Sequence, residues 1–129
     1  MIQKIGIKEG HRVALIGAPR DWTIDELPAS ARLTRRRGVS NVDVAIAFFR
    51  DQSSLRDEIV PLSKMITVDG ALWIAWPRRS GGHTSDLTDN VVRYVVLPLG
   101  LVDVKVAALD DDWSALKMMW RKELRVALR

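Results

Sequence analysis

Residues 42–49, with the sequence VDVAIAFF, constrain the fold of this 129-residue chain more than any other stretch. Asp43 is the single polar residue in the run, and a strand without polar alternation is typical of parallel sheets that are covered on both faces. A second apolar run, ALWIAW at residues 71–76, follows a segment with helical spacing. Buried strands that alternate with helices predict an α/β protein built on a mostly parallel sheet.

The rest of the chain adds the remaining elements of a β-α-β-β-α-β-α-β-β order. Strands are expected at residues 11–16, 31–35, 42–49, 71–76, 101–109 and 113–120. The second of these has few apolar residues, which predicts a sheet edge. The last two are joined by the short turn Asp110-Asp111-Asp112, which favours an antiparallel hairpin because a parallel neighbour needs a long crossover. We therefore expect one Rossmann-like, three-layer α/β domain over residues 1–129, with a C-terminal antiparallel β-hairpin.

Capping residues predict where the first two helices begin. Thr23 and Glu26 have the spacing of a capping box, which predicts a short helix between the first two strands. Ser53 or Ser54 is expected to cap the second helix, whose apolar residues recur as one stripe. The connection that contains the first helix is barely long enough for a parallel crossover.

Prolines and glycines predict the later boundaries. Pro61 lies within the second helical stripe and predicts a kink there or the start of a further helix. Asp69-Gly70 is expected to turn the chain into the strand at residues 71–76. The third helix is expected to begin at Ser85 or Asp86 and to end near Pro98.

Composition limits the class of protein. The chain has no cysteine, which excludes disulfides, thiolate zinc sites and a cysteine nucleophile, and fits a reducing compartment. Its longest uncharged run, residues 94–102, is far shorter than the roughly 20 residues that a membrane span needs, and no secretion signal is visible. We expect a cytoplasmic protein that does not bind membranes. A net charge of +4 permits an anionic partner.

The sequence RRSGGHT at residues 78–84 is the strongest candidate for a binding loop, because it follows a buried strand and precedes a helix. Guanidinium groups, glycine amides, hydroxyls and a helix N-terminus could together hold a phosphate or carboxylate. The turn after the first strand would lie at the same edge of the sheet. The expected ligand residues are Gly17, Arg20, Arg78, Arg79, Ser80, Gly81, Gly82, His83 and Thr84.

Each of these residues also has a purely structural interpretation. The loop could be solvated, with its arginines paired to Asp86 or Asp89 and its hydroxyls capping the helix. Trp22, close to Arg20, could stack on a base, but burial in the core is the more frequent fate of tryptophan. His83 could transfer protons, although the sequence identifies no carboxylate to orient it. No catalytic residue is predicted.

A second set of cations predicts an alternative role as a basic module that contacts nucleic acid or a partner protein. Its residues are Arg35, Arg36, Arg37, Arg121, Lys122 and Arg125. Such runs are often solvated turns or protection of a sheet edge. His11 and His83 lack metal-ligand spacing, so no metal is predicted. Residues 118–120, MMW, could contribute to a homodimer contact.

Three segments carry a resemblance to a known family: GALWIAWPRRSGG, SDLTDNVVR and GLVDVKVAALDDDWSALKM. They resemble a bacterial family of small uncharacterised proteins that look like shortened S-adenosylmethionine-dependent methyltransferases, in which a last strand also inserts antiparallel. The resemblance implies a glycine-rich turn with an acid after the first strand and a ribose-binding acid after the second. Here Gly17-Ala18-Pro19 and Arg35-Arg36-Arg37 stand at those places.

These departures disfavour S-adenosylmethionine as the cofactor, which is otherwise unknown. The sequence therefore favours a methyltransferase-like domain that lacks methyl-transfer activity and binds a small anionic or nucleotide-like ligand at the carboxyl end of its sheet. An active methyltransferase with an unusual pocket is the further alternative.

Overall fold

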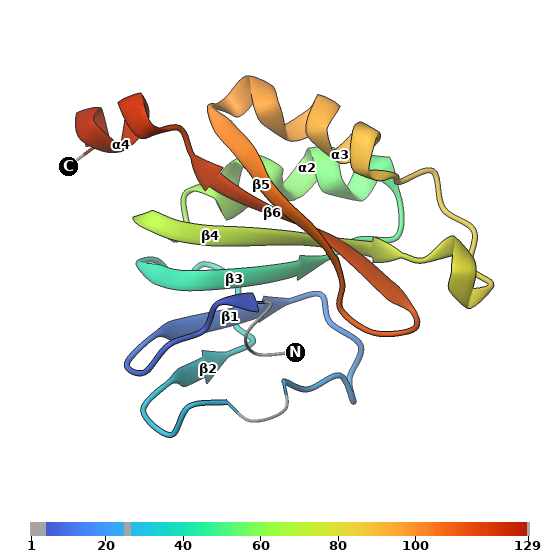
Figure 1. The fold of residues 1–129 in the computed structure, drawn as a ribbon, viewed down its shortest axis with the longest axis horizontal. Coiled ribbons are helices and arrows are strands. Elements are labelled where there is room, and N and C mark those ends of the chain that lie inside the picture. The colour runs from blue at the N-terminus through green and yellow to red at the C-terminus, as the bar shows by residue number, and fades with distance from the viewer. Residues whose placement is uncertain (1–4, 25–26, 129) are drawn as a thin grey trace.

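A computed structural model describes residues 5–24 and 27–128, and it contains one six-stranded sheet in the order β2-β1-β3-β4-β6-β5 (Figure 1). The strands are β1 Arg12–Ile16, β2 Arg32–Thr34, β3 Val42–Phe48, β4 Ile66–Pro77, β5 Leu101–Ala108 and β6 Trp113–Trp120. The α-helices are α2 Gln52–Ser63, α3 Asp89–Val96 and α4 Lys122–Leu128, and the 3-10 turns are η1 Arg79–Gly81 and η2 Leu97–Leu99.

Strands β2, β1, β3 and β4 are parallel, and β6 lies antiparallel between β4 and β5. The predicted Rossmann-like α/β fold with a C-terminal antiparallel hairpin is confirmed. β2 lies at an edge and β3 and β4 lie in the centre, as their apolar content predicts. In the part of the chain that the structure describes, no helix is long and apolar enough to cross a membrane.

Helices α2 and α3 cover one face of the sheet (Figure 1). Leu55 and Ile59 of α2 and Val92 of α3 pack there against residues such as Ala45 and Ile74 of the central strands. These side chains are all less than 5% exposed, so the apolar stripe expected for the second helix is buried. The amphipathic helices therefore find their partner surface on the continuous apolar strands, as binary patterning predicts.

On the opposite face, the described residues that cover the sheet come largely from loop segments. Ile5, Ile7, Trp22 and Ile24 are buried there against a cluster that includes Trp73 of β4. The prediction of a helix between β1 and β2 is wrong, because the described residues of that segment have no helical structure.

Burial explains this difference. Trp22 and Ile24 are buried while Thr23 is exposed, and an alternation of this kind belongs to extended chain and not to a helix. The capping box needed Glu26, which lies outside the described residues together with Asp25.

The second helix begins two residues earlier than a Ser53 cap would allow and three earlier than a Ser54 cap would allow. Asp51 is the N-cap of α2, and its Oδ1 accepts a hydrogen bond from the Ser54 amide at 2.8 Å. The prediction of Ser53 or Ser54 as the cap is therefore wrong. Pro61 lies inside α2, which ends two residues later at Ser63, so no second helix begins there.

The turn predicted at Asp69-Gly70 is also wrong, because both residues lie within β4. The pairing of β3 with β4 jumps from Val42–Ile66 to Val44–Ala71, so β4 bulges at this point. A Cβ at Gly70 would lie 2.9 Å from the carbonyl oxygen of Asp43, which explains why a glycine is required.

Thr88 is the N-cap of α3, and its Oγ1 accepts from the Val91 amide at 3.2 Å. The prediction of Ser85 or Asp86 as the cap is therefore wrong, and both residues bond to the segment after β3. Ser85 Oγ donates to the Arg50 carbonyl at 2.7 Å, and Asp86 Oδ1 accepts from the Gln52 amide at 2.8 Å. The loop before α3 is thus attached to the start of α2.

Candidate functional site

The carboxyl ends of β1, β3 and β4 meet the turn between β5 and β6 at one edge of the sheet. This edge is where open α/β sheets usually bind ligands. A cleft of about 220 Å³ lies there. Its lining residues are Pro19, Arg50, Pro77, His83, Asp112 and Trp113, and they come from five separate segments of the chain.

Arg50 lies two residues after the end of β3, and its guanidinium carbon lies 5.2 Å from the centroid of the Trp113 ring. Trp113 is only 5% exposed because it also packs edge-on against Phe48, with ring centroids 4.9 Å apart. A guanidinium at this distance from an indole is attracted by the ring electrons. Arg50 has no ion pair with any acid in the described part of the chain, so the contact holds an exposed, unpaired cation at the cleft.

His83 has an orienting carboxylate that the sequence did not identify. Its Nε2 lies 2.9 Å from Oδ1 of Asp112, which belongs to the β5–β6 turn. Both side chains are more than a third exposed, so solvent screens the pair. The contact nevertheless orients the imidazole ring at the cleft, and it occupies one oxygen of the Asp112 carboxylate.

Arg78 serves the structure of the loop. Its guanidinium donates to the Asp110 carbonyl and its amide to the Asp112 carbonyl, both at 2.8 Å. These bonds fasten the β4–α3 loop to the hairpin turn. The guanidinium is half-buried in this role and does not line the cleft, so its predicted contact with a ligand has no geometric support.

The predicted cradle of free glycine amides is wrong. The Gly81 amide bonds to the Arg78 carbonyl at 3.2 Å and the Gly82 amide to the Arg79 carbonyl at 2.9 Å, within the 3-10 turn. The α3 N-terminus begins at Asp89 and not near Asp86. Gly81 has a packing role instead, since a Cβ there would lie 2.6 Å from the Asp111 carbonyl oxygen.

The turn after β1 lies against the end of β3. Gly17 has a φ of +70°, and a Cβ on it would lie 2.9 Å from the Phe48 carbonyl oxygen. Pro19 reaches the cleft and Arg20 is exposed beside it. Trp22 is buried, as its core interpretation predicts, and its Nε1 donates to Asp110 Oδ2 at 2.9 Å.

His83 is the one predicted ligand residue that lines this cleft within the described chain. Arg79, Ser80 and Thr84 are exposed on the same loop. The lining residues that sequence reasoning missed are Pro19, Arg50, Pro77, Asp112 and Trp113. Arg50 had a usable signal, because it directly follows the strongest apolar run and therefore had to lie at the carboxyl edge.

The two halves of the alternative basic surface lie far apart (Figure 1). Arg35 to Arg37 follow β2 at one edge of the sheet, whereas Arg121 and Lys122 follow β6 near the other. Arg37 forms an ion pair with Glu58 of α2, Arg35 donates to the Trp22 carbonyl, and Arg125 donates to the Trp120 carbonyl. The fold does not join these cations into one track.

The remaining candidates have structural partners. His11 Nδ1 accepts from the Lys8 amide at 3.1 Å. Asp110 Oδ1 accepts from the Asp112 and Trp113 amides, which shapes the hairpin turn. Among the described residues, no cluster of three or more His, Asp or Glu side chains could hold a metal ion. Met118, considered for a dimer contact, is fully buried in the core of the sheet.

No protein-family model and no curated protein matches the sequence. Solved structures do match it. A TehB-like SAM-dependent methyltransferase from Corynebacterium glutamicum aligns with a TM-score of 0.59 and 7% identity, over 93% of this chain and 85% of that one. A SAM-dependent methyltransferase from Aquifex aeolicus aligns with a TM-score of 0.61 and 11% identity, over 93% and 87%.

This chain has the fold of SAM-dependent methyltransferases. The fibrillarin pre-rRNA processing protein of Methanococcus jannaschii shares it, with a TM-score of 0.57 and 13% identity over 88% of this chain and 68% of that one. The resemblance read from the sequence is therefore confirmed at the level of the methyltransferase fold. Identities this low show the fold alone.

Two positions depart from the pattern that the methyltransferase resemblance implies. The place of the ribose-binding acid after the second strand holds Arg35 to Arg37, and Arg37 is paired to Glu58. The turn after β1 has Gly17 packed on the backbone of β3, followed by Ala18 and Pro19. The first of these positions therefore presents cations and the second presents packed backbone, where the resemblance implies an acid and a glycine-rich turn.

Proposed function

We propose that this methyltransferase-fold domain binds a small anionic ligand, such as the phosphate end of a nucleotide, at the carboxyl-edge cleft and does not transfer methyl groups. The observation that carries the proposal is the Arg50 guanidinium, held against Trp113 at a cleft where the ends of three strands converge. A cation fixed at this edge by an aromatic ring is already positioned for an anion, so less side-chain entropy is lost when the anion binds.

The charges around the cleft support an anion. Arg50 lines the cleft, and Arg20 and Arg79 are exposed on the two loops beside it. The single acid in the lining, Asp112, already contacts His83. Charge-assisted hydrogen bonds from guanidinium to phosphate are among the stronger polar contacts in proteins. The Trp113 and Arg50 pair also offers a flat surface to a base or ring.

The size of the cleft supports a head group more than a whole cofactor. Its volume of about 220 Å³ is below the roughly 300–1,000 Å³ of pockets that enclose drug-sized ligands. A phosphate would fit within it, with the remainder of a nucleotide outside. The arginines after β2, where a methyltransferase resemblance implies an acid, further support a role without methyl transfer.

Titration calorimetry with tripolyphosphate, ATP and S-adenosylmethionine tests the proposal. Wild type is expected to bind the first two, and Arg50→Gln to bind them about tenfold to a hundredfold more weakly, the value of one charge-assisted hydrogen bond. Arg121→Gln is the matched control, because it removes the same charge from the far edge of the sheet. Its affinity should stay within about twofold of wild type.

Two results would reject the proposal. The first is no heat of binding for either phosphate compound with wild type. The second is an equal loss in Arg50→Gln and Arg121→Gln, which would show attraction by net charge alone. Binding of S-adenosylmethionine tighter than ATP would favour the methyltransferase alternative instead. Thermal melts of each variant confirm that the variants remain folded.

A further inference from the structure

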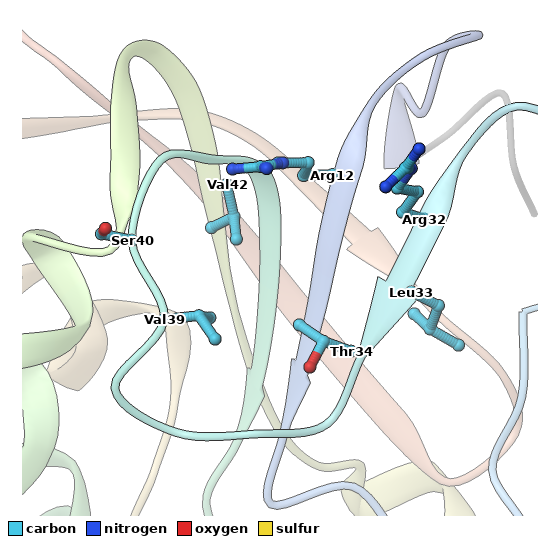
Figure 2. Close-up of a pocket in the computed structure, with 7 residues that line it drawn as sticks. All are labelled: Arg12, Arg32, Leu33, Thr34, Val39, Ser40 and Val42. Carbon is cyan, nitrogen blue, oxygen red and sulfur yellow. The ribbon is translucent and has the colours of Figure 1, made fainter.

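A separate cavity of about 360 Å³ lies over the outer strands β1 and β2, toward their amino ends (Figure 2). In the described part of the chain, α2 packs over β4 and α3 over β5 and β6, so neither of these two helices lies over β2 (Figure 1). The β2–β3 loop crosses beside the cavity. Its lining residues are Arg12, Arg32, Leu33, Thr34, Val39, Ser40 and Val42.

Arg12 and Arg32 are register partners on adjacent parallel strands. Partners in a sheet point to the same face from strands about 4.8 Å apart. Like charges directly opposite each other destabilise a sheet. Among the described residues, neither guanidinium takes part in an ion pair with a carboxylate. Asp43 lies nearby, but its Oδ2 accepts from the backbone amide of Arg12 at 2.8 Å.

The other walls supply a hydroxyl and apolar surface. Thr34 lies two residues after Arg32 and therefore on the same face of β2, whereas the Ser40 side chain lies on the outer side of the loop, beyond Val39 and Val42 (Figure 2). Thr34 Oγ1 accepts from the Arg36 amide at 3.2 Å, which leaves its hydroxyl proton for another acceptor. Val42 is 2% exposed and Val39 packs against the core beside it.

We propose that this cavity is a second binding site, for a small phosphomonoester with a short apolar body. A phosphate monoester carries nearly two negative charges at neutral pH, which matches two uncompensated guanidinium groups. Its three terminal oxygens suit two guanidinium forks and the Thr34 hydroxyl. A carboxylate offers half the charge and one oxygen fewer. The apolar body would lie on the partly buried Val39.

The size and the position of the cavity support an independent site. About 360 Å³ falls within the range of small-molecule pockets. None of its lining residues lines the carboxyl-edge cleft, so the two sites use different arginines. The binding of one ligand can therefore be abolished without touching the other site.

The test is titration of ¹⁵N-labelled protein with phenyl phosphate, followed by amide NMR. Amides of residues 12–14, 32–34 and 39–42 are expected to shift. Arg32→Gln and Arg12→Gln should each weaken binding at least tenfold, corresponding to about 1.4 kcal/mol. Removing one of two opposed charges should not unfold the chain, and thermal melts without ligand should show equal or higher stability.

Arg121→Gln is the matched control, because Arg121 lines neither this cavity nor the carboxyl-edge cleft, and its shifts at residues 12–14 and 32–34 should match those of wild type. Shifts at the carboxyl-edge cleft are followed separately, so failure of one site is distinguishable from failure of the other. Three results would overturn the proposal. They are the absence of shifts at residues 12–14 and 32–34 at millimolar phenyl phosphate, an equal loss of binding there in Arg121→Gln, and binding of benzoate as tight as that of phenyl phosphate. Inorganic phosphate should bind more weakly than phenyl phosphate, and equal affinity would contradict the role of Val39.

Discussion

The indole Nε1 of Trp22 donates a hydrogen bond to Oδ2 of Asp110 at 2.9 Å, although 88 positions separate the two residues. The bond joins the loop after β1 to the turn between β5 and β6. Trp22 also packs edge-on against Phe48 at the end of β3, with ring centroids 4.9 Å apart. One side chain therefore holds together the segments that surround the carboxyl-edge cleft.

Asp110 should be far more important for stability than its neighbour Asp111. Its carboxylate accepts from Trp22 and from the amides of Asp112 and Trp113. Asp110→Ala removes all three bonds and should lower the free energy of unfolding by about 2–3 kcal/mol, at roughly 1 kcal/mol for each bond. Asp111→Ala, at an exposed site, should change it by less than about 0.5 kcal/mol. Urea unfolding of both variants tests this difference, and equal values would contradict it.

Gly17 should tolerate alanine less well than Gly10. Both have a positive φ, so alanine at either position costs about 1–2 kcal/mol of backbone strain. At Gly17 the added Cβ would also lie 2.9 Å from the Phe48 carbonyl oxygen, whereas at Gly10 it would meet nothing within 4 Å. Thermal denaturation should show the larger loss for Gly17→Ala. Similar losses would mean that the approach of the turn to β3 is not tight.

Acid should weaken the N-terminus of α2. Hydrogen bonds from Ser54 lower the pKa of Asp51 below its ordinary 3.8. A lowered pKa means that the unfolded chain binds the proton more readily, so this stabilisation is present above pH 3.8 and is lost as the pH falls through the lower folded value. Asp51→Asn keeps an acceptor at the cap but cannot titrate. It should match wild type at pH 7 and show a shallower loss of stability between about pH 4 and 2.

Lys117 should also make stability rise with pH, but at the alkaline end of the range. Burial, followed by repulsion from Lys105 and Lys8, lowers its pKa from the ordinary 10.5. The charged form is therefore disfavoured in the fold, and its cost is present at neutral pH and disappears as the pH rises through the lowered pKa toward 10.5. Lys117→Met should unfold at a higher temperature than wild type at pH 7, with a smaller advantage at pH 10. The exposed Lys64→Met is the control, and an equal gain there would contradict the assignment.

Much of the sheet could be predicted because its central strands are almost continuously apolar. Residues 42–49 and 71–76 fit only a sheet that is covered on both faces, and β3 and β4 are central as that pattern requires. The short Asp110–Asp112 turn likewise required a hairpin. These patterns lie within the residues of each element, so the elements can be predicted without knowing which segments pack against them.

The errors occur where a distant segment decides the local structure. The Thr23 spacing favours a helix, but burial of Trp22 and Ile24 on the sheet holds the chain extended. Ser85 could have capped α3, but it donates instead to the carbonyl of Arg50. Sequence spacing describes contacts within about one turn, whereas these partners come from other parts of the chain.

The candidate site also combines a feature that local sequence predicts with features that depend on distant segments. Its position at the carboxyl edge was predictable, because strand order places the ends of β1, β3 and β4 together. Its side chains were not, because the Arg50 contact with Trp113 joins residues from two different strand ends. The predicted loop instead uses Arg78 and its glycine amides to hold its own shape.

The most direct test of the anion-binding account is an amide NMR titration of the wild-type protein with ATP. The account predicts concentration-dependent shifts that cluster at Arg50, His83, Asp112 and Trp113, the residues of the carboxyl-edge cleft. Saturation with shifts confined to the basic segments at residues 35–37 and 121–125, or no shifts at millimolar ATP, would contradict it.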